Sequence, residues 1–270
     1  MKQSSFQVRE TRTLLERLPL WANRRQRRRV KRARTLLERL YPVSTNKELI
    51  RFGPNSDGGY LIPNDLEGIQ ACFSPGVSDI SGFEKACAEL GINVFLADGS
   101  VDGPADEHKL FHFTKKYIGE TTGNGFMTLD DWVASSIDDQ AADLLLQIDI
   151  EGDEYEVFRT LSETVLQRFR IIVAEFHWLE ELLGERSVEV SSVFNKILQH
   201  HACVHIHPNN CGGYLVLNGL DIPNVMEFTF LRRDRISHSS YQTIFPHPLD
   251  CDNSPNPPII LPNCWYGSEA

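Results

Sequence analysis

Carboxylates follow an apolar run in the middle of the chain. Residues 144–150 read Leu-Leu-Leu-Gln-Ile-Asp-Ile, and Glu151 and Glu154 come soon after them. A buried β-strand that ends in an acidic residue is how open α/β sheets place reactive groups beside a ligand. We therefore predict that Asp149, Glu151 and Glu154 reach a functional site, whereas Asp153 is expected to be a solvated charge near a helix N-terminus.

Imidazoles end two further apolar segments. Glu175 and His177 come at the end of one of them, and His205 and His207 alternate in the next. Side chains alternate along a β-strand, so that His205 and His207 would share one face. Adjacent parallel strands would bring these tips to Asp149. Two histidines and one carboxylate form a usual ligand set for a divalent ion. The alternative is that each histidine is a structural residue that hydrogen-bonds within the core.

Strands and helices must alternate to hold these tips in place, and the pattern of apolar residues indicates that they do. The predicted strands cover residues 68–77, 92–98, 110–114, 144–150, 170–176, 204–207, 213–217 and 225–232, and the predicted helices cover 80–90, 129–136, 154–165 and 188–200. This order predicts a parallel sheet covered on both faces, with antiparallel strands added at the end. The tail from Phe245 is rich in Pro, Asn and Asp, which indicates an ordered loop or a flexible terminus.

The ends of the first two predicted strands have the features of a nucleoside site. Residues 74–84 lead from a strand into a helix through Gly76 and Gly82, where the backbone can approach a ligand and the helix start offers free N–H groups. Asp98 ends the second strand, where an acid can accept hydrogen bonds from both ribose hydroxyls. A structural turn at the glycines and a capping role for Asp98 are the alternatives.

Composition limits the class of protein. At 270 residues and 41% hydrophobic content, the chain can bury the core of one large domain. Six cysteines without a C-x-x-C pair indicate neither a disulfide framework nor a zinc ribbon. There is no apolar run of the ~20 residues that a bilayer requires and no secretory pattern at the start. We therefore expect a cytoplasmic protein.

Positive charge is concentrated at the start of the chain. Residues 1–40 hold 13 Lys or Arg and 3 Glu, whereas the other 230 residues hold 14 basic and 34 acidic residues. Residues 18–40 are predicted to form a basic amphipathic helix, within an N-terminal extension of residues 1–44 that precedes a domain of residues 45–270. This helix would suit an anionic membrane surface or a polyanionic partner, or it would neutralise the acidic body of its own or a neighbouring subunit. The oligomeric state is left open. The excess of acidic residues in the other 230 residues argues against nucleic acid as a partner.

Several segments together resemble a known family. They occur in the order seen in FkbM-type S-adenosylmethionine-dependent methyltransferases, and the resemblance covers roughly residues 48–234. The segments are Gly76–Glu84, Leu96–Asp98, Thr128–Trp132, Gln147–Glu154, Val173–His177, His205–Asn210 and Ile222–Glu227, with Asn55–Tyr60 resembling the branch that carries His-x-His-x-Asn-Asn. The resemblance implies a Rossmann-like sheet of seven strands, S-adenosylmethionine as cofactor, and O-methylation of a sugar, a glycan precursor or another small hydroxylated metabolite.

The resemblance also implies roles for individual residues. The catalytic residues would be Asp149, Glu151, His177 and His207. The cofactor would contact Asp57, Gly58, Gly59, Tyr60, Ser74, Gly76, Ser81, Phe83 and Asp98. The turn at residues 57–60 has a plain alternative, which is a β-turn without contact to a ligand.

Methyl transfer is an in-line displacement, so the protein must align the acceptor oxygen and remove its proton. Two versions are open. In the first, Asp149, His177 and His207 bind Mg²⁺, Mn²⁺ or Fe²⁺, and the metal activates the acceptor; in the second, His177 or His207 is a metal-free base. Two other classes are alternatives: a nicotinamide-dependent oxidoreductase, which should show a tighter glycine pattern, and a non-catalytic protein that docks through residues 18–40.

Overall fold

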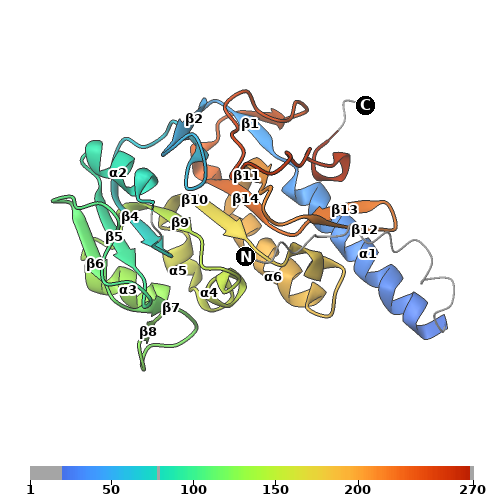
Figure 1. Cartoon of the computed structure of the whole chain (residues 1–270), viewed down its shortest axis with the longest axis horizontal. Coiled ribbons are helices and arrows are strands. Elements are labelled where there is room, and N and C mark those ends of the chain that lie inside the picture. Colours follow the sequence, from blue (N-terminus) through green and yellow to red (C-terminus); the bar gives the residue numbers. More distant parts are fainter. Residues whose placement is uncertain (1–19, 78–79, 268–270) are drawn as a thin grey trace.

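A central sheet of seven strands organises the computed structural model, which describes residues 20–77 and 80–267 (Figure 1). The first two residues of the predicted basic helix, and Ser78 and Asp79 of the glycine-containing turn, lie outside the described residues. In spatial order the strands are β11 (His201–Pro208), β14 (Met226–Arg232), β10 (Phe169–Phe176), β9 (Asp143–Ile148), β4 (Ile69–Pro75), β5 (Asn93–Ala97) and β6 (Phe111–Thr114). Neighbouring strands are parallel except at β14, which is antiparallel to both of its neighbours. The predicted Rossmann-like α/β fold is confirmed.

Apolar side chains cover both faces of this sheet. On one face lie α1 (Leu20–Leu40), α3 (Leu129–Ser136), α4 (Glu154–Thr160), α5 (Glu163–Leu166) and α6 (Ser187–His200). On the other lie α2 (Gly82–Glu89) and the hairpin of β2 (Leu49–Phe52) and β3 (Tyr60–Pro63). Because helices cover both faces, all the parallel strands can be apolar throughout, as the sequence indicated.

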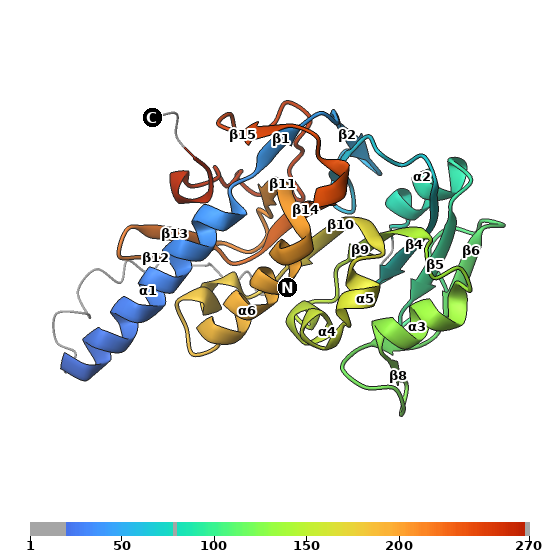
Figure 2. The same ribbon diagram turned by 180° about the vertical axis from the view of Figure 1, so that it is seen from behind.

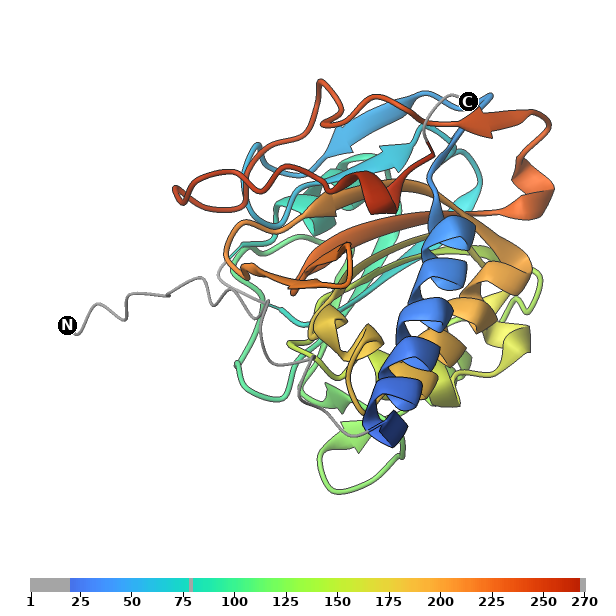
Figure 3. The ribbon, with the colours of Figure 1, turned by 90° about the vertical axis from the view of Figure 1, so that its right-hand side faces the viewer.

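The basic helix α1 packs against the rest of the fold. Ala33, Leu36, Leu37 and Leu40 are buried in the same core as α6, and Figures 2 and 3 show α1 and α6 side by side. Three or four residues separate these positions, which is the spacing of one helix face. The charged residues therefore lie on the remaining faces. No helix among the described residues is long and apolar enough to cross a bilayer.

Two predicted elements differ from the structure. The helix expected over residues 154–165 is interrupted, because Ser162 has an extended backbone. Its hydroxyl accepts a hydrogen bond from Val165 N and caps the start of α5. The strand expected over residues 213–217 is β12 (Tyr214–Leu217), which does not join the central sheet. It pairs instead with β13 (Leu220–Pro223) through a two-residue turn whose residues both have positive φ.

Short elements complete the fold. The remaining small sheets are β1 (Val43–Thr45) with β15 (Ser239–Tyr241), and β7 (Tyr117–Ile118) with β8 (Phe126–Met127). Single 3₁₀ turns are η2 (Leu179–Leu182), η3 (Arg233–Arg235) and η4 (Asn263–Trp265).

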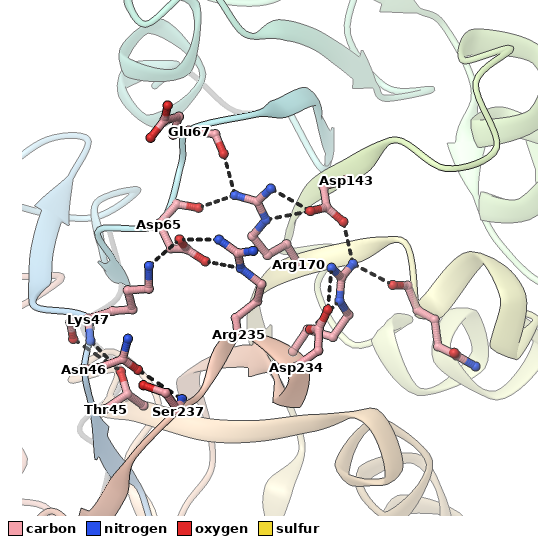
Figure 4. A network of polar contacts seen from close by, with 12 residues as sticks. Thr45, Asn46, Lys47, Asp65, Glu67, Asp143, Arg170, Asp234, Arg235 and Ser237 are labelled. Atoms are coloured by element: carbon pink, nitrogen blue, oxygen red, sulfur yellow. Dashed lines mark hydrogen bonds and ion pairs between the residues drawn. The ribbon is translucent and has the colours of Figure 1, made fainter.

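The edge of the sheet where β9 and β10 begin is closed by ion pairs (Figure 4). Asp65 binds Arg235 and Lys47, and Asp143 binds Arg170. Burial opposes ionisation of Asp65, but the hydrogen bonds from Arg235 and Lys47 lower its pKa to about 2. Each acid at this edge thus has a basic partner, which is the pattern of structural ion pairs.

Candidate functional site

The opposite edge brings the ends of β4, β5 and β9 together around Gly76. Gly76 has a φ of +91°, and a Cβ built on it would lie 1.7 Å from Asp149 O. Its N–H donates to Ala97 O at 3.0 Å. Only glycine fits this close approach, so Gly76 fixes Asp98 and Asp149 near one turn. The ends of these three strands therefore lie together at this edge of the sheet.

Asp98 takes part in the turn that follows β5. One carboxylate oxygen, Oδ1, accepts hydrogen bonds at 2.6 Å from both the Ser100 N–H and the Ser100 hydroxyl. The capping role is therefore present in this structure. It uses one oxygen of a half-buried side chain, which is compatible with a contact between the carboxylate and ribose hydroxyls.

Two of the predicted cofactor residues, Ser74 and Phe83, have buried side chains. Ser74 is fully buried, and its hydroxyl lies 2.6 Å from Glu84 Oε1 and 2.6 Å from Gln147 Oε1. The Phe83 ring is buried against the Tyr60 ring, with centroids 5.7 Å apart. Both side chains are already in contact with other buried side chains. A cofactor contact from Ser74 or Phe83 would therefore have to come from the backbone.

The predicted turn at residues 57–60 packs against the start of α2. A Cβ on Gly59 would lie 1.9 Å from Pro54 O, and a Cβ on Gly82 would lie 2.7 Å from Pro54 Cδ, so both glycines permit close packing. Ser81 precedes α2 and is buried with no hydrogen-bond partner for its hydroxyl among the described residues. The turn is therefore held next to the start of α2.

A row of ionisable side chains crosses the sheet at its carboxyl edge. Glu227 of β14 lies directly between Glu175 of β10 and His207 of β11 in the strand register. Asp149 follows the register pair Ile148 and Ala174, which places it beside Glu175. Residues paired directly across strands share one face of a sheet. The row thus reads His207, Glu227, Glu175 and Asp149.

His177 is held at the end of this row by Glu154. Glu154 Oε1 accepts hydrogen bonds from Ile150 N at 3.0 Å and Gly152 N at 3.1 Å, and it lies 3.3 Å from His177 Nδ1. Burial lowers the pKa of His177, but the hydrogen bond with Glu154 and the surrounding acids raise it overall. A proton on Nδ1 leaves Nε2 facing the carboxylates of Glu151 and Glu175.

Asp149, Glu151 and His177 form the group that can hold a metal ion. One ligand atom from each lies within 4.8 Å of the others, the only such group of three or more His, Cys, Asp or Glu found among residues 20–77 and 80–267. His207 lies outside it. The expected set of Asp149, His177 and His207 is therefore corrected, because β14 separates β10 from β11 and removes His207 from the other two.

Carboxylates in this region lack the basic partners seen at the opposite edge. Asp149 Oδ1 and Glu175 Oε2 are buried without a hydrogen-bond partner among the described residues. Burial, followed by the neighbouring acids, raises the pKa of Asp149 to about 7, although His177 opposes the shift. Burial and the charges of Asp149 and Glu227 raise the pKa of Glu175 well above its usual value. Perturbed acids of this kind are typical of functional sites.

Two residues at the site have a strained backbone. Glu151, a member of the group, has a φ of 59°, and Trp178, next to His177, has a φ of 55°. Residues other than glycine rarely adopt this region. A Cβ on Gly152 would lie 2.4 Å from Trp178 Nε1, so the loops after β9 and β10 touch. Backbone strain of this sort concentrates at sites where a ligand binds.

The comparison with protein families decides between the alternative classes. Residues 90–202 match the family described as the methyltransferase FkbM domain. This similarity supports a methyltransferase. The match includes Asp98, Asp149, Glu151, Glu175 and His177, and it favours methyl transfer over nicotinamide-dependent oxidation. No curated protein matches the chain.

The tail after Phe245 packs against the row of acids. Asn253 Nδ2 donates to Glu227 Oε1 at 2.7 Å and to Asp57 Oδ1 at 3.2 Å. Asp250 lies 2.8 Å from His205 Nε2 and 3.6 Å from His207 Nδ1. The two histidines share one face, as predicted, and the tail after Phe245 is an ordered loop up to residue 267.

Sequence reasoning did not predict the contacts of this tail. Asn210 anchors it, because its side chain donates to Ser254 O and Asn256 O at 2.9 Å each. A cavity of about 250 Å³ lies between this segment and the end of β11. Its lining includes His207, Asp250, Phe245, Ile259 and Leu261. The segment has no periodicity, and its polar contacts reach residues from 26 to 196 positions away, so only the density of Asn and Asp could have drawn attention to it.

Proposed function

We propose that this protein uses S-adenosylmethionine to methylate a hydroxyl group of a sugar, a glycan precursor or another small hydroxylated metabolite. The observation that carries the proposal is the close packing at Gly76, where the ends of β4, β5 and β9 bring Asp98 near Asp149 and the buried Glu175. The donor and acceptor sites of a methyl transfer must lie side by side in this way.

The ends of β4 and β5 and the start of α2 have features that suit the cofactor. Gly76 allows close approach of the backbone, Asp98 can accept hydrogen bonds from ribose hydroxyls, and the Ser81 hydroxyl is buried without a partner among the described residues. The turn at residues 57–60 would cover the methionine end. When bound, S-adenosylmethionine supplies a methyl group on a positively charged sulfur.

The acceptor side offers hydrogen-bond acceptors for hydroxyl groups. Glu175 and Glu227 line the row with Asn209 and Asn253 as their amide partners. Polar groups of this density suit a carbohydrate better than an apolar acceptor. His177 Nε2 lies 3.6 Å from Glu175 Oε1, where it can take the proton from the attacking oxygen.

Binding measurements test the cofactor first. Equilibrium dialysis is expected to show binding of S-adenosylmethionine and none of NAD, because the chain lacks the tight glycine pattern of nicotinamide sites. Replacing Asp98 with asparagine keeps an oxygen for the Ser100 turn but removes the charge. We expect the affinity for S-adenosylmethionine to fall about 10-fold to 30-fold, as for loss of a charge-assisted hydrogen bond of roughly 1.5–2 kcal/mol. Isothermal titration measures the change.

The control for Asp98 is Asp102→Asn in the same loop, an exposed residue that pairs with Lys115. Unchanged affinity in Asp98→Asn and Asp98→Ala together would remove Asp98 from the cofactor site.

We further propose that the outer face of α1 contacts an anionic membrane surface, which would hold a cytoplasmic enzyme at that membrane. Arg24, Arg28 and Lys31 are exposed and recur at helical spacing opposite Ala33 and Leu37. A groove of about 370 Å³ between α1 and α6 is lined by basic residues, which are Arg28, Lys31, Arg32 and Arg39. The alternative, neutralisation of the acidic body, is seen at Arg29, which pairs with Glu185 at 2.6 Å.

Vesicle binding tests this surface. Replacing Arg24, Arg28 and Lys31 with glutamine should weaken binding to phosphatidylcholine vesicles that contain phosphatidylserine by about 100-fold at low salt, at about 1 kcal/mol per basic residue. Binding of the unchanged protein should decrease as salt is added. The matched control replaces Lys85, Lys109 and Lys116, which are exposed on the body. Equal losses in both triple variants, or equal binding to pure phosphatidylcholine, would contradict a specific role for α1.

A further inference from the structure

We propose that Asp149, Glu151 and His177 bind one divalent cation of the Mn²⁺ class, which lies beside the acceptor hydroxyl. This inference rests on the proposed methyl transfer for its role, but the binding site stands on its own geometry. Two carboxylates supply hard oxygen ligands and one imidazole supplies a borderline nitrogen ligand. Mn²⁺ accepts both kinds, whereas Mg²⁺ prefers oxygen and Zn²⁺ favours more nitrogen or sulfur.

The spacing of the three groups suits a single ion. Their ligand atoms all lie within 4.8 Å of one another, and two ligands on opposite sides of one ion are separated by roughly 4.2–4.4 Å. The Glu151 side chain is 89% exposed, so a rotation of its carboxylate can close the remaining gap. The other two side chains are fixed by the strand ends.

Glu154 holds the other ring nitrogen of His177. Its Oε1 is held by the N–H groups of Ile150 and Gly152 and lies 3.3 Å from His177 Nδ1. Histidines that bind metals donate their other ring N–H to a carboxylate in this way, which fixes the ring and directs the free nitrogen to the ion. Nε2 of His177 lies 3.5 Å from Glu151 Oε2 and is thus directed into the group.

Buried oxygens without hydrogen-bond partners are an independent indication that a cation binds here. The Glu175 side chain is only 5% exposed, its Oε2 has no hydrogen-bond partner among the described residues, and its Oε1 lies 3.6 Å from His177 Nε2. Asp149 Oδ1 is likewise buried without a partner. No ion pair joins Asp149, Glu151 or Glu175 to a Lys or Arg within residues 20–77 and 80–267. A cation would supply the charge that Arg235 and Arg170 supply at the other edge.

The backbone conformation after β9 also supports the proposed site. Glu151 has a left-handed backbone conformation, and its carboxylate lies near His177 Nε2, in the same group as Asp149. An acceptor hydroxyl that joins the ion would lose its proton more readily. The cation would thereby activate the oxygen with His177 as a ligand, and the hydroxyl proton would pass to the neighbouring carboxylate of Glu175.

The test titrates Mn²⁺ alone into the full chain and follows free Mn²⁺ by electron paramagnetic resonance. One ion per chain is expected. Glu151→Gln is the first variant because its exposed side chain carries no folding role, and Asp149→Asn and His177→Gln follow. Each should weaken Mn²⁺ binding at least about 10-fold, and Glu154→Gln should weaken it by a similar factor through the orientation of His177. Circular dichroism verifies that each variant is folded.

His207→Gln is the matched control, since it removes a buried imidazole from the same row without touching the proposed ligands. Its Mn²⁺ affinity should equal that of the unchanged protein. Absence of binding, or equal loss in His207→Gln and Glu151→Gln, would overturn the site. Mn²⁺ binding without methyl transfer would contradict the proposed function and leave the metal site standing, whereas full methyl transfer in a strong chelator without Mn²⁺ binding would do the reverse.

Discussion

Replacing Asp149 or His177 with alanine is expected to lower the rate of methyl transfer by about 10³-fold, within the range that loss of acid–base or metal activation produces. Both residues face the row of acids on the acceptor side, at the ends of β9 and β10. The proposed cofactor contacts lie at the ends of β4 and β5, so the affinity for S-adenosylmethionine should stay within a few-fold of the original value. Single-turnover kinetics with saturating cofactor would measure the rate, and isothermal titration the affinity.

Asp153→Ala is the control in the same loop. Asp153 is exposed and makes no side-chain capping hydrogen bond at the start of α4, so its removal should leave both quantities unchanged. Turnover within about threefold of the original in Asp149→Ala and His177→Ala would reject the assigned roles. Loss of cofactor affinity together with turnover would instead place these residues in the donor site.

Local patterns predicted the elements that hold the site. Residues 129–136 form a helix with the predicted bounds, and the strands at residues 92–98, 144–150 and 170–176 are each correct to within two residues at either end. These strands are buried on both faces, so their apolar runs are continuous and easily read. Gly76 and Asp98 could be placed at strand ends for the same reason.

Interactions distant in the chain were beyond the reach of such patterns. β14 enters the sheet between β10 and β11, although it follows both in the sequence, and this order separates His207 from His177. No local signal specifies strand order. The break at Ser162 was readable, since serine is a preferred N-cap residue, but the apolar spacing across it resembled one continuous helix.

The acids of the site also show what periodicity cannot reveal. Glu151 and Glu154 were both expected near the site, yet one is an exposed side chain in a strained loop and the other is fully buried behind His177. Their different tasks depend on the backbone after β9. Glu227 was recognised only as part of a family segment, and its place in the row became visible when β14 was seen between its neighbours.

Glu227 gives the second large effect, on stability. Burial raises its pKa to about 7 from an ordinary value of 4.5, and His207 and Asn253 oppose the shift only in part. Other charged groups act on it as well: Glu175 is its register partner on β10, and the charge of Arg51 lowers its pKa while that of Asp250 raises it. Because the pKa is raised in the folded state, Glu227 favours folding below pH 4.5, and this contribution is lost as the pH rises through about 7.

Glu227→Gln imitates the protonated acid and keeps an acceptor for Asn253. The variant and the original protein should therefore have equal free energies of unfolding near pH 4.5, whereas at pH 8 the variant should be more stable by about 3 kcal/mol. Urea denaturation at the two pH values measures this difference, with the exposed Glu89→Gln as the control that shows none. A variant less stable than the original at pH 8 would mean that Glu227 is ionised and held by His207, and the acids of this row would then be charged before any ligand binds.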